Sequence, residues 1–312
     1  MTSDILLTPT IPVAPEGFKS GFVALMGRPN VGKSTLMNKL VGQKIAITSP
    51  IAQTTRNRLR GIFTTDTAQI IFVDTPGIHK PHHELGKILV KNARSTVGAV
   101  DLIVFIVDGS VPLGKGDLFI ADFLKKTESN VILGVNKIDQ RPDGKPHILR
   151  SYQELAEENQ WTLQEFSALN GDRLNSLQNI LTDTLETGPY YYPPDLVTDQ
   201  PERFIIAELI REQILLHTRQ EVPHSVAIVI EQINEAPELT EVRAAINVER
   251  SSQKGILIGK KGSMLKQIGT AARQQIQKLI AGKVYLELFV KVQPKWRQSR
   301  INLAELGYQI ED

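Results

Sequence analysis

The chain has 312 residues, of which 41% are hydrophobic and 22% charged, and its formal net charge is +2. This length exceeds what one hydrophobic core normally organises, so two domains are expected, and no apolar run is long enough to cross a bilayer. The absence of cysteine excludes disulfides, thiolate metal sites and cysteine nucleophiles.

The N-terminal stretch MTSDILLTPTIPVAPEGF is rich in proline and threonine and has no basic side chain. It differs in this from a secretory signal and from an arginine-rich transit peptide. We expect residues 1–18 to form a disordered tail.

Residues 19–187 alternate between short apolar runs and longer helix-compatible segments. The strand-like runs are FVALMG, AQIIFVD, DLIVFIVDG, NVILGVNK and TLQEFSA. This alternation predicts an α/β domain with a mostly parallel sheet and helices on both faces. RLRGIFTT precedes AQIIFVD closely enough to pair with it as an antiparallel edge hairpin.

The first strand leads into GRPNVGKST, which satisfies GxxxxGK[ST] between a strand and a helix. Backbone N–H groups of such a loop surround nucleotide phosphates. Lys33 is predicted to reach the β- and γ-phosphates, and the Ser34 hydroxyl to ligate Mg²⁺. The predicted nucleotide contacts of this P-loop are Gly27, Arg28, Pro29, Asn30, Val31, Gly32, Lys33, Ser34 and Thr35.

DTPG closes the strand IIFVD. Its Asp74 is placed to assist Mg²⁺ binding, and the Gly77 N–H to meet a γ-phosphate. DTPG alone can be an ordinary turn, but its spacing after the P-loop favours the nucleotide role.

NKID, at the end of a later apolar strand, indicates which base is bound. The Asp139 carboxylate can accept two hydrogen bonds from guanine, whereas adenine lacks those donors and would leave a buried carboxylate unpaired. Lys137 would lie along the base and Asn136 would brace the pocket. The turn formed by Ser167, Ala168 and Leu169 can offer the Ala168 N–H to the guanine carbonyl. GTP and GDP are therefore the expected ligands.

In this order the motifs resemble those of translation-factor-like small GTPases, and QTTR (Gln53 to Arg56) resembles the first switch segment of the Era family. The resemblance implies that Thr54 or Thr55 closes on Mg²⁺ when GTP is bound. Thr55 is favoured because related GTPases place their threonine immediately before an arginine. The alternative is an ordinary surface loop.

Ile78 follows DTPG where many GTPases carry a glutamine that orients the attacking water. Isoleucine cannot do this, so we expect slow intrinsic hydrolysis, roughly 10⁻⁴ to 10⁻² s⁻¹. Relatives that the chain resembles use an asparagine at the position of Asn30 to help hold K⁺; its alternative role is to cap the loop. The predicted catalytic residues are Lys33, Thr55, Gly77 and Asn30. The nearby His79, His82 and His83 are interpreted as solvated switch residues.

Residues 188–202, GPYYYPPDLVTDQPE, are proline-rich and predict a linker. The order helix, two strands, two helices and a strand then predicts a small α+β domain over residues 203–301, followed by a tail at 302–312. Between Arg250 and Arg300 there are twelve basic residues and one acid, whereas the preceding residues carry a net charge of −6. Such a concentration indicates an anionic polymer or surface as partner.

GILIGKKGSML, beginning at Gly255, contains GxxG rather than GxxxxGK[ST]. GxxG is the backbone clamp of KH domains, which bind single-stranded nucleic acid, and the order of elements resembles the type II KH fold. Trp296 either stacks on a base or covers the end of the KH core. The predicted RNA contacts are Gly255, Ile256, Ile258, Gly259, Lys260, Lys261, Gly262, Lys266, Lys295, Trp296 and Arg297.

A KH domain after such a GTPase domain is the arrangement of the Era family, and the resemblance extends from about Gly21 to Arg300. It implies a monomeric cytoplasmic GTPase that binds the 3′ end of 16S rRNA, assists maturation of the 30S subunit and contacts the inner membrane peripherally. Charge and spacing by themselves indicate only that a single strand is plausible. One alternative is a GTPase with a membrane or protein partner and a KH scaffold; another is a binding module with incidental hydrolysis. An ATP-driven RNA enzyme is disfavoured by NKID.

Overall fold

The structure is a computed structural model that describes residues 11–51, 54–77, 84–280, 282–306 and 308. The predictions for residues 1–10, Gln53, Ile78 and the histidines His79, His82 and His83 lie outside the described residues. The chain divides into two compact units. The first comprises Met1–Ile45, Arg58–Thr75 and Arg94–Asp199, and the second comprises Ala46–Asn57, Pro76–Ala93 and Gln200–Asp312.

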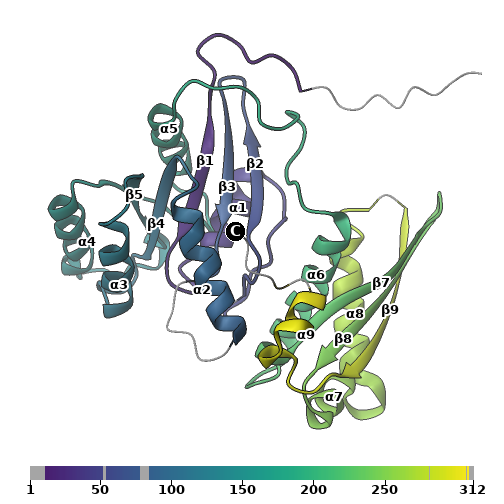
Figure 1. The fold of residues 1–312 in the computed structure, drawn as a ribbon. Coiled ribbons are helices and arrows are strands. Elements are labelled where there is room, and N and C mark those ends of the chain that lie inside the picture. Colours follow the sequence, from purple (N-terminus) through teal and green to yellow (C-terminus); the bar gives the residue numbers. More distant parts are fainter. Residues whose placement is uncertain (1–10, 52–53, 78–83, 281, 307, 309–312) are drawn as a thin grey trace, which may run out of the picture. The chain divides into compact units, whose positions relative to one another are not determined.

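The first unit is built on a six-stranded sheet in the order β2-β3-β1-β4-β5-β6 (Figure 1). Its strands are β1 (Lys19–Met26), β2 (Leu59–Thr64), β3 (Ala68–Asp74), β4 (Leu102–Asp108), β5 (Asn130–Asn136) and β6 (Thr162–Glu165). Its helices are α1 (Lys33–Val41), η1 (Ile138–Gln140), α3 (Lys115–Leu124), α4 (Pro146–Asn159) and α5 (Leu174–Thr184), while α2 (Glu84–Val97) begins in the second unit.

All neighbouring strands of this sheet run parallel except β2, which pairs antiparallel with β3. The edge hairpin is therefore confirmed. All seven residues of β3 are buried and β4 is buried up to Val107, as expected for parallel strands covered on both faces. The P-loop, DTPG and NKID follow β1, β3 and β5, so the parallel arrangement brings the three motifs to one edge of the sheet.

Part of the predicted linker packs on the first unit instead of running free. The Gln69 side chain accepts hydrogen bonds from the backbone N–H of Tyr191 at 2.8 Å and of Tyr192 at 3.0 Å. The Ile62 N–H donates to the Val197 carbonyl at 2.9 Å. Phe18, which the sequence assigned to the N-terminal tail, is 2% exposed. The edge strand β2 and the Gln69 side chain of β3 thus form hydrogen bonds with the predicted linker.

The second unit contains a three-stranded mixed sheet, ordered β7-β8-β9, with β7 antiparallel and β9 parallel to β8. Helices α6, α7 and α8 pack on this sheet (Figure 1). The elements are α6 (Glu202–His217), η2 (Pro223–Ser225), β7 (Ala227–Glu235), β8 (Leu239–Val248), α7 (Ser251–Ile258), η3 (Lys260–Gly262), α8 (Ser263–Ile276), β9 (Lys283–Val292), η4 (Trp296–Gln298) and α9 (Arg300–Glu305). The predicted fold class, an α/β P-loop domain followed by an α+β KH domain, is confirmed.

The apolar side chains of α6 and α8 form a core against β8, with Ile210, Ile246 and Ile268 fully buried. The predicted C-terminal tail joins a second cluster, because Leu303 and Tyr308 are buried there. No helix among the described residues has the length and hydrophobicity needed to cross a membrane.

Candidate functional site

The P-loop is shaped by glycines that no other residue could replace without displacing a neighbour. Gly27 has a φ of 154°, and a Cβ there would lie 2.3 Å from the Ile106 carbonyl oxygen. Gly32 has a φ of 102°, and its Cβ would lie 2.2 Å from Nδ2 of Asn136. The loop therefore passes directly against β4 and the NKID motif, and it ends at the N-terminus of α1, where backbone N–H groups favour an anion.

Lys33 is buried at the start of α1. Its Nζ donates to the backbone carbonyls of Gly27 at 3.1 Å and Arg28 at 2.9 Å. Burial lowers the pKa of Lys33 to about 8, although the negative charge of Asp74 raises it in part. A polyphosphate beside this ammonium group would supply the missing negative charge and restore its affinity for the proton.

Ser34 and Asp74 form a pair that suits Mg²⁺. The Ser34 Oγ donates to Asp74 Oδ2 at 2.6 Å, and Asp74 is fully buried at the end of β3. A hydroxyl and a carboxylate are hard oxygen donors of the kind that Mg²⁺ takes beside nucleotide phosphates. The residues present therefore fit the predicted metal. No cluster of three or more metal-ligating His, Cys, Asp or Glu side chains occurs in the described part of the chain.

Asn136 holds together the loops around the expected guanine site. Its Nδ2 donates to the Val31 carbonyl at 2.7 Å, and its Oδ1 accepts from the Ala168 N–H at 2.9 Å. The position of Asn136 agrees with the bracing role expected of it. The Ala168 N–H, however, is committed to Asn136, so a bond to the guanine carbonyl would have to share or replace this one. Asp139 is exposed, and so is Leu169.

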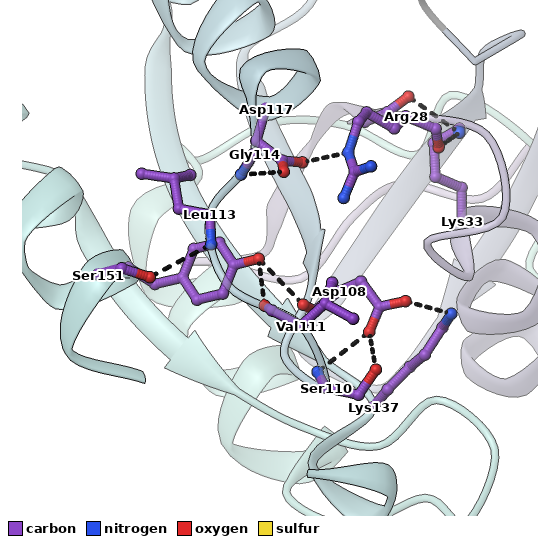
Figure 2. A network of polar contacts seen from close by, with 12 residues as sticks. Arg28, Lys33, Asp108, Ser110, Val111, Leu113, Gly114, Asp117, Lys137 and Ser151 are labelled. Carbon is purple, nitrogen blue, oxygen red and sulfur yellow. Dashed lines mark hydrogen bonds and ion pairs between the residues drawn. The ribbon is translucent and has the colours of Figure 1, made fainter. Parts of the chain in front are cut away.

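Two carboxylates that the sequence analysis did not identify hold two of the predicted nucleotide contacts (Figure 2). Asp117, with a fully buried side chain, accepts from Arg28 Nε at 2.6 Å and from the Gly114 N–H at 3.1 Å. Asp108 accepts from Lys137 Nζ at 2.6 Å. An acid at the end of β4 repeats the pattern of Asp74 at the end of β3, and this is the signal that could have drawn attention to Asp108.

The predicted first switch segment belongs to the second unit. Arg56 is 4% exposed, and its guanidinium donates to the carbonyls of Val226 at 2.6 Å and Pro223 at 3.1 Å. Arg211 of α6 donates to the Thr54 carbonyl. The residues on either side of Thr55 are thus tied to the KH-bearing unit. The predicted Mg²⁺ contact of Thr55 remains a prediction.

The segment after DTPG also belongs to the second unit, where Leu85 and Ile88 pack with Trp296, Leu303 and Tyr308. Gly77 is buried, and its predicted contact with a γ-phosphate remains a prediction. Both segments that the sequence identified as nucleotide-responsive therefore share a core with the KH domain. The local sequence does not predict that these segments pack with the KH domain, because the partners of the first switch segment lie more than 150 residues away in the chain.

The GxxG loop has the backbone that its glycines predict. Gly259 and Gly262 have φ values of 70° and 80°, and a Cβ on Gly259 would lie 2.7 Å from Cβ of Met264. Lys260 and Lys261 are exposed, and Lys261 itself has a φ of 53°. The two cations therefore stand on a tight turn between α7 and α8. Ile256 is 47% exposed beside them and Lys266 is exposed on α8.

The structure decides between the two roles considered for Trp296. Trp296 is fully buried, stacks on Tyr308 with ring centroids 5.9 Å apart, and donates its Nε1–H to the Ser225 carbonyl at 3.0 Å. It covers the end of the KH core and has no free face for a base. Arg297 forms an ion pair with Glu249 and keeps 18% of its side chain exposed, so its contact with RNA remains a prediction. Lys295 is exposed.

Comparisons with known proteins agree with this geometry. Residues 22–137 match the family described as 50S ribosome-binding GTPase, and residues 221–297 match the KH domain. The chain is 68% identical to the GTPase Era of Rippkaea orientalis over 97% of this chain and 96% of the relative. It is 67% identical to the GTPase Era of Crocosphaera subtropica over the same shares.

Two solved structures share the fold of nearly the whole chain. A point variant of Aquifex aeolicus Era bound to GDP and AlF₄⁻ is 39% identical, with a TM-score of 0.89 over 93% of this chain and 99% of that one. Era in complex with MgGDPNP and nucleotides 1506–1542 of 16S ribosomal RNA is 38% identical, with the same TM-score and coverage.

Proposed function

The chain belongs to the Era family of GTPases, and we propose that it is a GTP-driven switch that binds the 3′ end of 16S rRNA and assists assembly of the 30S subunit. The observation that carries the RNA assignment is the 38% identical Era bound to both MgGDPNP and 16S rRNA nucleotides 1506–1542. In this chain, the RNA assignment is supported by Lys260 and Lys261, which are exposed on the turn between Gly259 and Gly262. The same proposal places the protein in the cytoplasm.

For the nucleotide site we propose that Lys33 and the loop amides bind the phosphates, and that Ser34 and Asp74 hold Mg²⁺ with Thr55. Bound Mg²⁺ would neutralise charge that develops on the phosphates during hydrolysis. The side chains of Asn136, Lys137 and Asp139 would bind guanine. We further propose that Asn30, which is exposed on the loop with a φ of 64°, contributes to a K⁺ site.

The K⁺ proposal is tested by measuring GTP hydrolysis in K⁺ and in Na⁺ at equal ionic strength. Faster hydrolysis in K⁺ that is lost in Asn30→Ala supports it. Equal rates in both salts assign Asn30 to the loop structure alone.

The contacts of the first switch segment support a coupling between GTP and RNA. Arg56 and the Thr54 carbonyl are both held by groups of the KH-bearing unit, and Thr48 N–H donates to Glu212 of α6 at 2.9 Å. A segment that follows the γ-phosphate would therefore act on α6 and on the turn before β7. We propose that GTP alters RNA affinity through these contacts.

The deciding experiment measures RNA affinity in each nucleotide state. The RNA is a labelled single strand copied from the 3′ end of 16S rRNA, with a scrambled strand as control, over a salt series. The proteins are wild type, Lys260→Asp/Lys261→Asp and the matched control Lys125→Asp/Lys126→Asp, which alters an exposed lysine pair of the first unit. Each protein carries GDP or a non-hydrolysable GTP analogue.

Tighter, sequence-dependent binding in the GTP state supports the proposal if only the Lys260/Lys261 variant loses it. Loss of both cations should also reduce the slope of log affinity against log salt by about 1.4. Weak binding that is equal in both nucleotide states refutes the proposed switch. That result would favour the alternative of a membrane or protein partner, with the KH domain as scaffold.

A further inference from the structure

The β4–α3 loop of the first unit connects the P-loop to the guanine motif (Figure 2). At one end of the loop, Asp108 contacts Lys137; at the other, Asp117 contacts Arg28. β4 and β5 are parallel neighbours in a register that places Asp108 beside Asn136. The Gly109 N–H donates to the Asn136 carbonyl at 2.7 Å. The end of β4 therefore lies directly against the residues expected to bind the base.

Both carboxylate oxygens of Asp108 have partners, so its orientation is fixed. Oδ1 accepts from the Ser110 N–H at 3.0 Å and from the Ser110 hydroxyl at 2.5 Å, while Oδ2 faces Lys137. Burial by itself raises the pKa of Asp108, but the hydrogen bonds from Lys137 and Ser110 outweigh burial and hold that pKa below its ordinary value. Asp108 is consequently a carboxylate whose charge is well stabilised at neutral pH.

The backbone of the loop is held as firmly as the carboxylate. The Tyr152 hydroxyl, from a fully buried side chain on α4, lies 3.0 Å from the carbonyl oxygens of both Asp108 and Val111. The Leu113 N–H donates to the Ser151 hydroxyl at 3.3 Å. Movement of Asp108 away from Lys137 would therefore disturb several bonds at once.

Lys137 needs such an anchor because of its place in the chain. It has a φ of 63°, in the turn between β5 and the short helix η1, and its side chain is 25% exposed. A partly exposed lysine has four rotatable bonds, and ordering it on ligand binding is costly. The ion pair with Asp108 orders it in advance.

We propose that Asp108 is a positioning residue for guanine-nucleotide binding, which holds the ammonium group of Lys137 so that its aliphatic stem forms a preformed wall of the base site. This inference rests on the proposed contact between Lys137 and guanine. Asp108 touches no nucleotide; it lowers the ordering cost of Lys137.

The test measures release and affinity of a ribose-labelled GDP in the full-length protein. Asp108→Asn keeps the size of the side chain and removes its charge, and Lys137→Met keeps the stem and removes the ammonium group. Each single change should weaken GDP binding about tenfold, the size expected for loss of a charged hydrogen bond. Asp122→Asn, at an exposed acid of α3, is the matched control and should leave affinity unchanged.

The double variant separates positioning from general support of the fold. If Asp108 acts through Lys137, Asp108→Asn adds no further loss to Lys137→Met. Affinity for inorganic pyrophosphate, which lacks a base, should also stay at the wild-type value in Asp108→Asn. Additive losses, or equal losses for GDP and pyrophosphate, would overturn the proposal and assign Asp108 to the stability of the loop.

Two further outcomes are distinguishable. A wild-type protein that does not prefer GDP to ADP contradicts the proposed guanine site itself. A wild type that prefers GDP, together with an unaffected Asp108→Asn variant, contradicts only the positioning role. If Asp108→Asn does not fold, Ser110→Ala tests the same idea, because it removes the hydroxyl bond that helps to orient the carboxylate and keeps the charge. A smaller loss of GDP affinity in the same direction is expected, and wild-type affinity would contradict the proposal.

Discussion

Replacing Arg56 with methionine should selectively destabilise the second unit. Besides Val226 and Pro223, its guanidinium donates to the His224 carbonyl at 3.3 Å. A methionine fills part of the space but leaves the Val226 and Pro223 carbonyls without this donor, while the His224 carbonyl keeps its bond from Arg297 Nη1 at 3.3 Å. An unsatisfied buried acceptor costs about 1–3 kcal/mol, and relaxation recovers part of the total, so we expect a loss of about 3–5 kcal/mol.

The two tryptophans allow each unit to be followed separately. Trp161 belongs to the first unit, and Trp296 of the second unit bonds to Ser225, in the same turn that Arg56 holds. In a Trp161→Phe background, urea unfolding followed by fluorescence reports the second unit. At a urea dependence of about 2 kcal/mol/M, the midpoint should fall by about 1.5–2.5 M.

The control is Arg243→Met, which removes an exposed ion pair with Glu287 and should leave the midpoint unchanged. In a Trp296→Phe background, Arg56→Met should shift the midpoint of the first unit less than that of the second. An unchanged midpoint in the second unit would refute the reasoning from buried carbonyls. Folded Arg56→Met protein should also show a smaller difference in RNA affinity between its GTP and GDP states.

Three further predictions concern the two sites. The pKa of Lys33 is about 8 in the folded, nucleotide-free protein, whereas its ordinary value is 10.5. Between these two pH values the unfolded state binds more protons than the folded state. Lys33 therefore makes the nucleotide-free protein more stable as the pH rises from about 8 to 10.5. Bound phosphates should raise the pKa of Lys33, so the affinity for GDP should fall above about pH 8. Calorimetry in two buffers should detect proton uptake when GDP binds. Binding without proton uptake would contradict the prediction. Asp117→Ala removes the buried partner of Arg28. It should weaken GDP binding, and it should also lower the free energy of unfolding by about 2–4 kcal/mol, as measured by urea titration. An unchanged urea titration would contradict the prediction. Gly259→Ala should lower RNA affinity by about tenfold or more in a filter-binding assay, since its Cβ would lie 2.7 Å from Met264. Gly98→Ala, in the first unit with open space around it, should leave RNA affinity unchanged.

The nucleotide motifs were recognisable from sequence because each is a short, contiguous device. Gly27 and Gly32 have the positive φ values that the loop requires, and Asp74 is the last residue of an apolar strand whose end must lie at the sheet edge. The hairpin of β2 and β3 was likewise predictable, since three residues separate the two strands. In the second unit, the order of helices and strands with GxxG was enough to predict the KH fold.

Only the tertiary structure decided the side-chain partners. From its sequence context among basic residues, Trp296 could equally stack on a base or fill a core. Its stacking on Tyr308 and its hydrogen bond to Ser225 show that it fills a core. The pairs Arg28–Asp117 and Lys137–Asp108 join residues 89 and 29 positions apart. Such pairs depend on how strands and helices are placed in space, which the pattern of a single segment does not contain.

The sequence by itself determined the chemistry of this protein: a triphosphate cradle, a guanine-selective motif and a glycine turn suited to RNA. The tertiary structure decided what each piece is attached to. It joined the segment around Arg56 to the KH-bearing unit through carbonyls about 170 residues away. The physical reason is that phosphate and base recognition use groups adjacent in the chain, whereas coupling between sites uses buried polar groups that only the folded chain brings together.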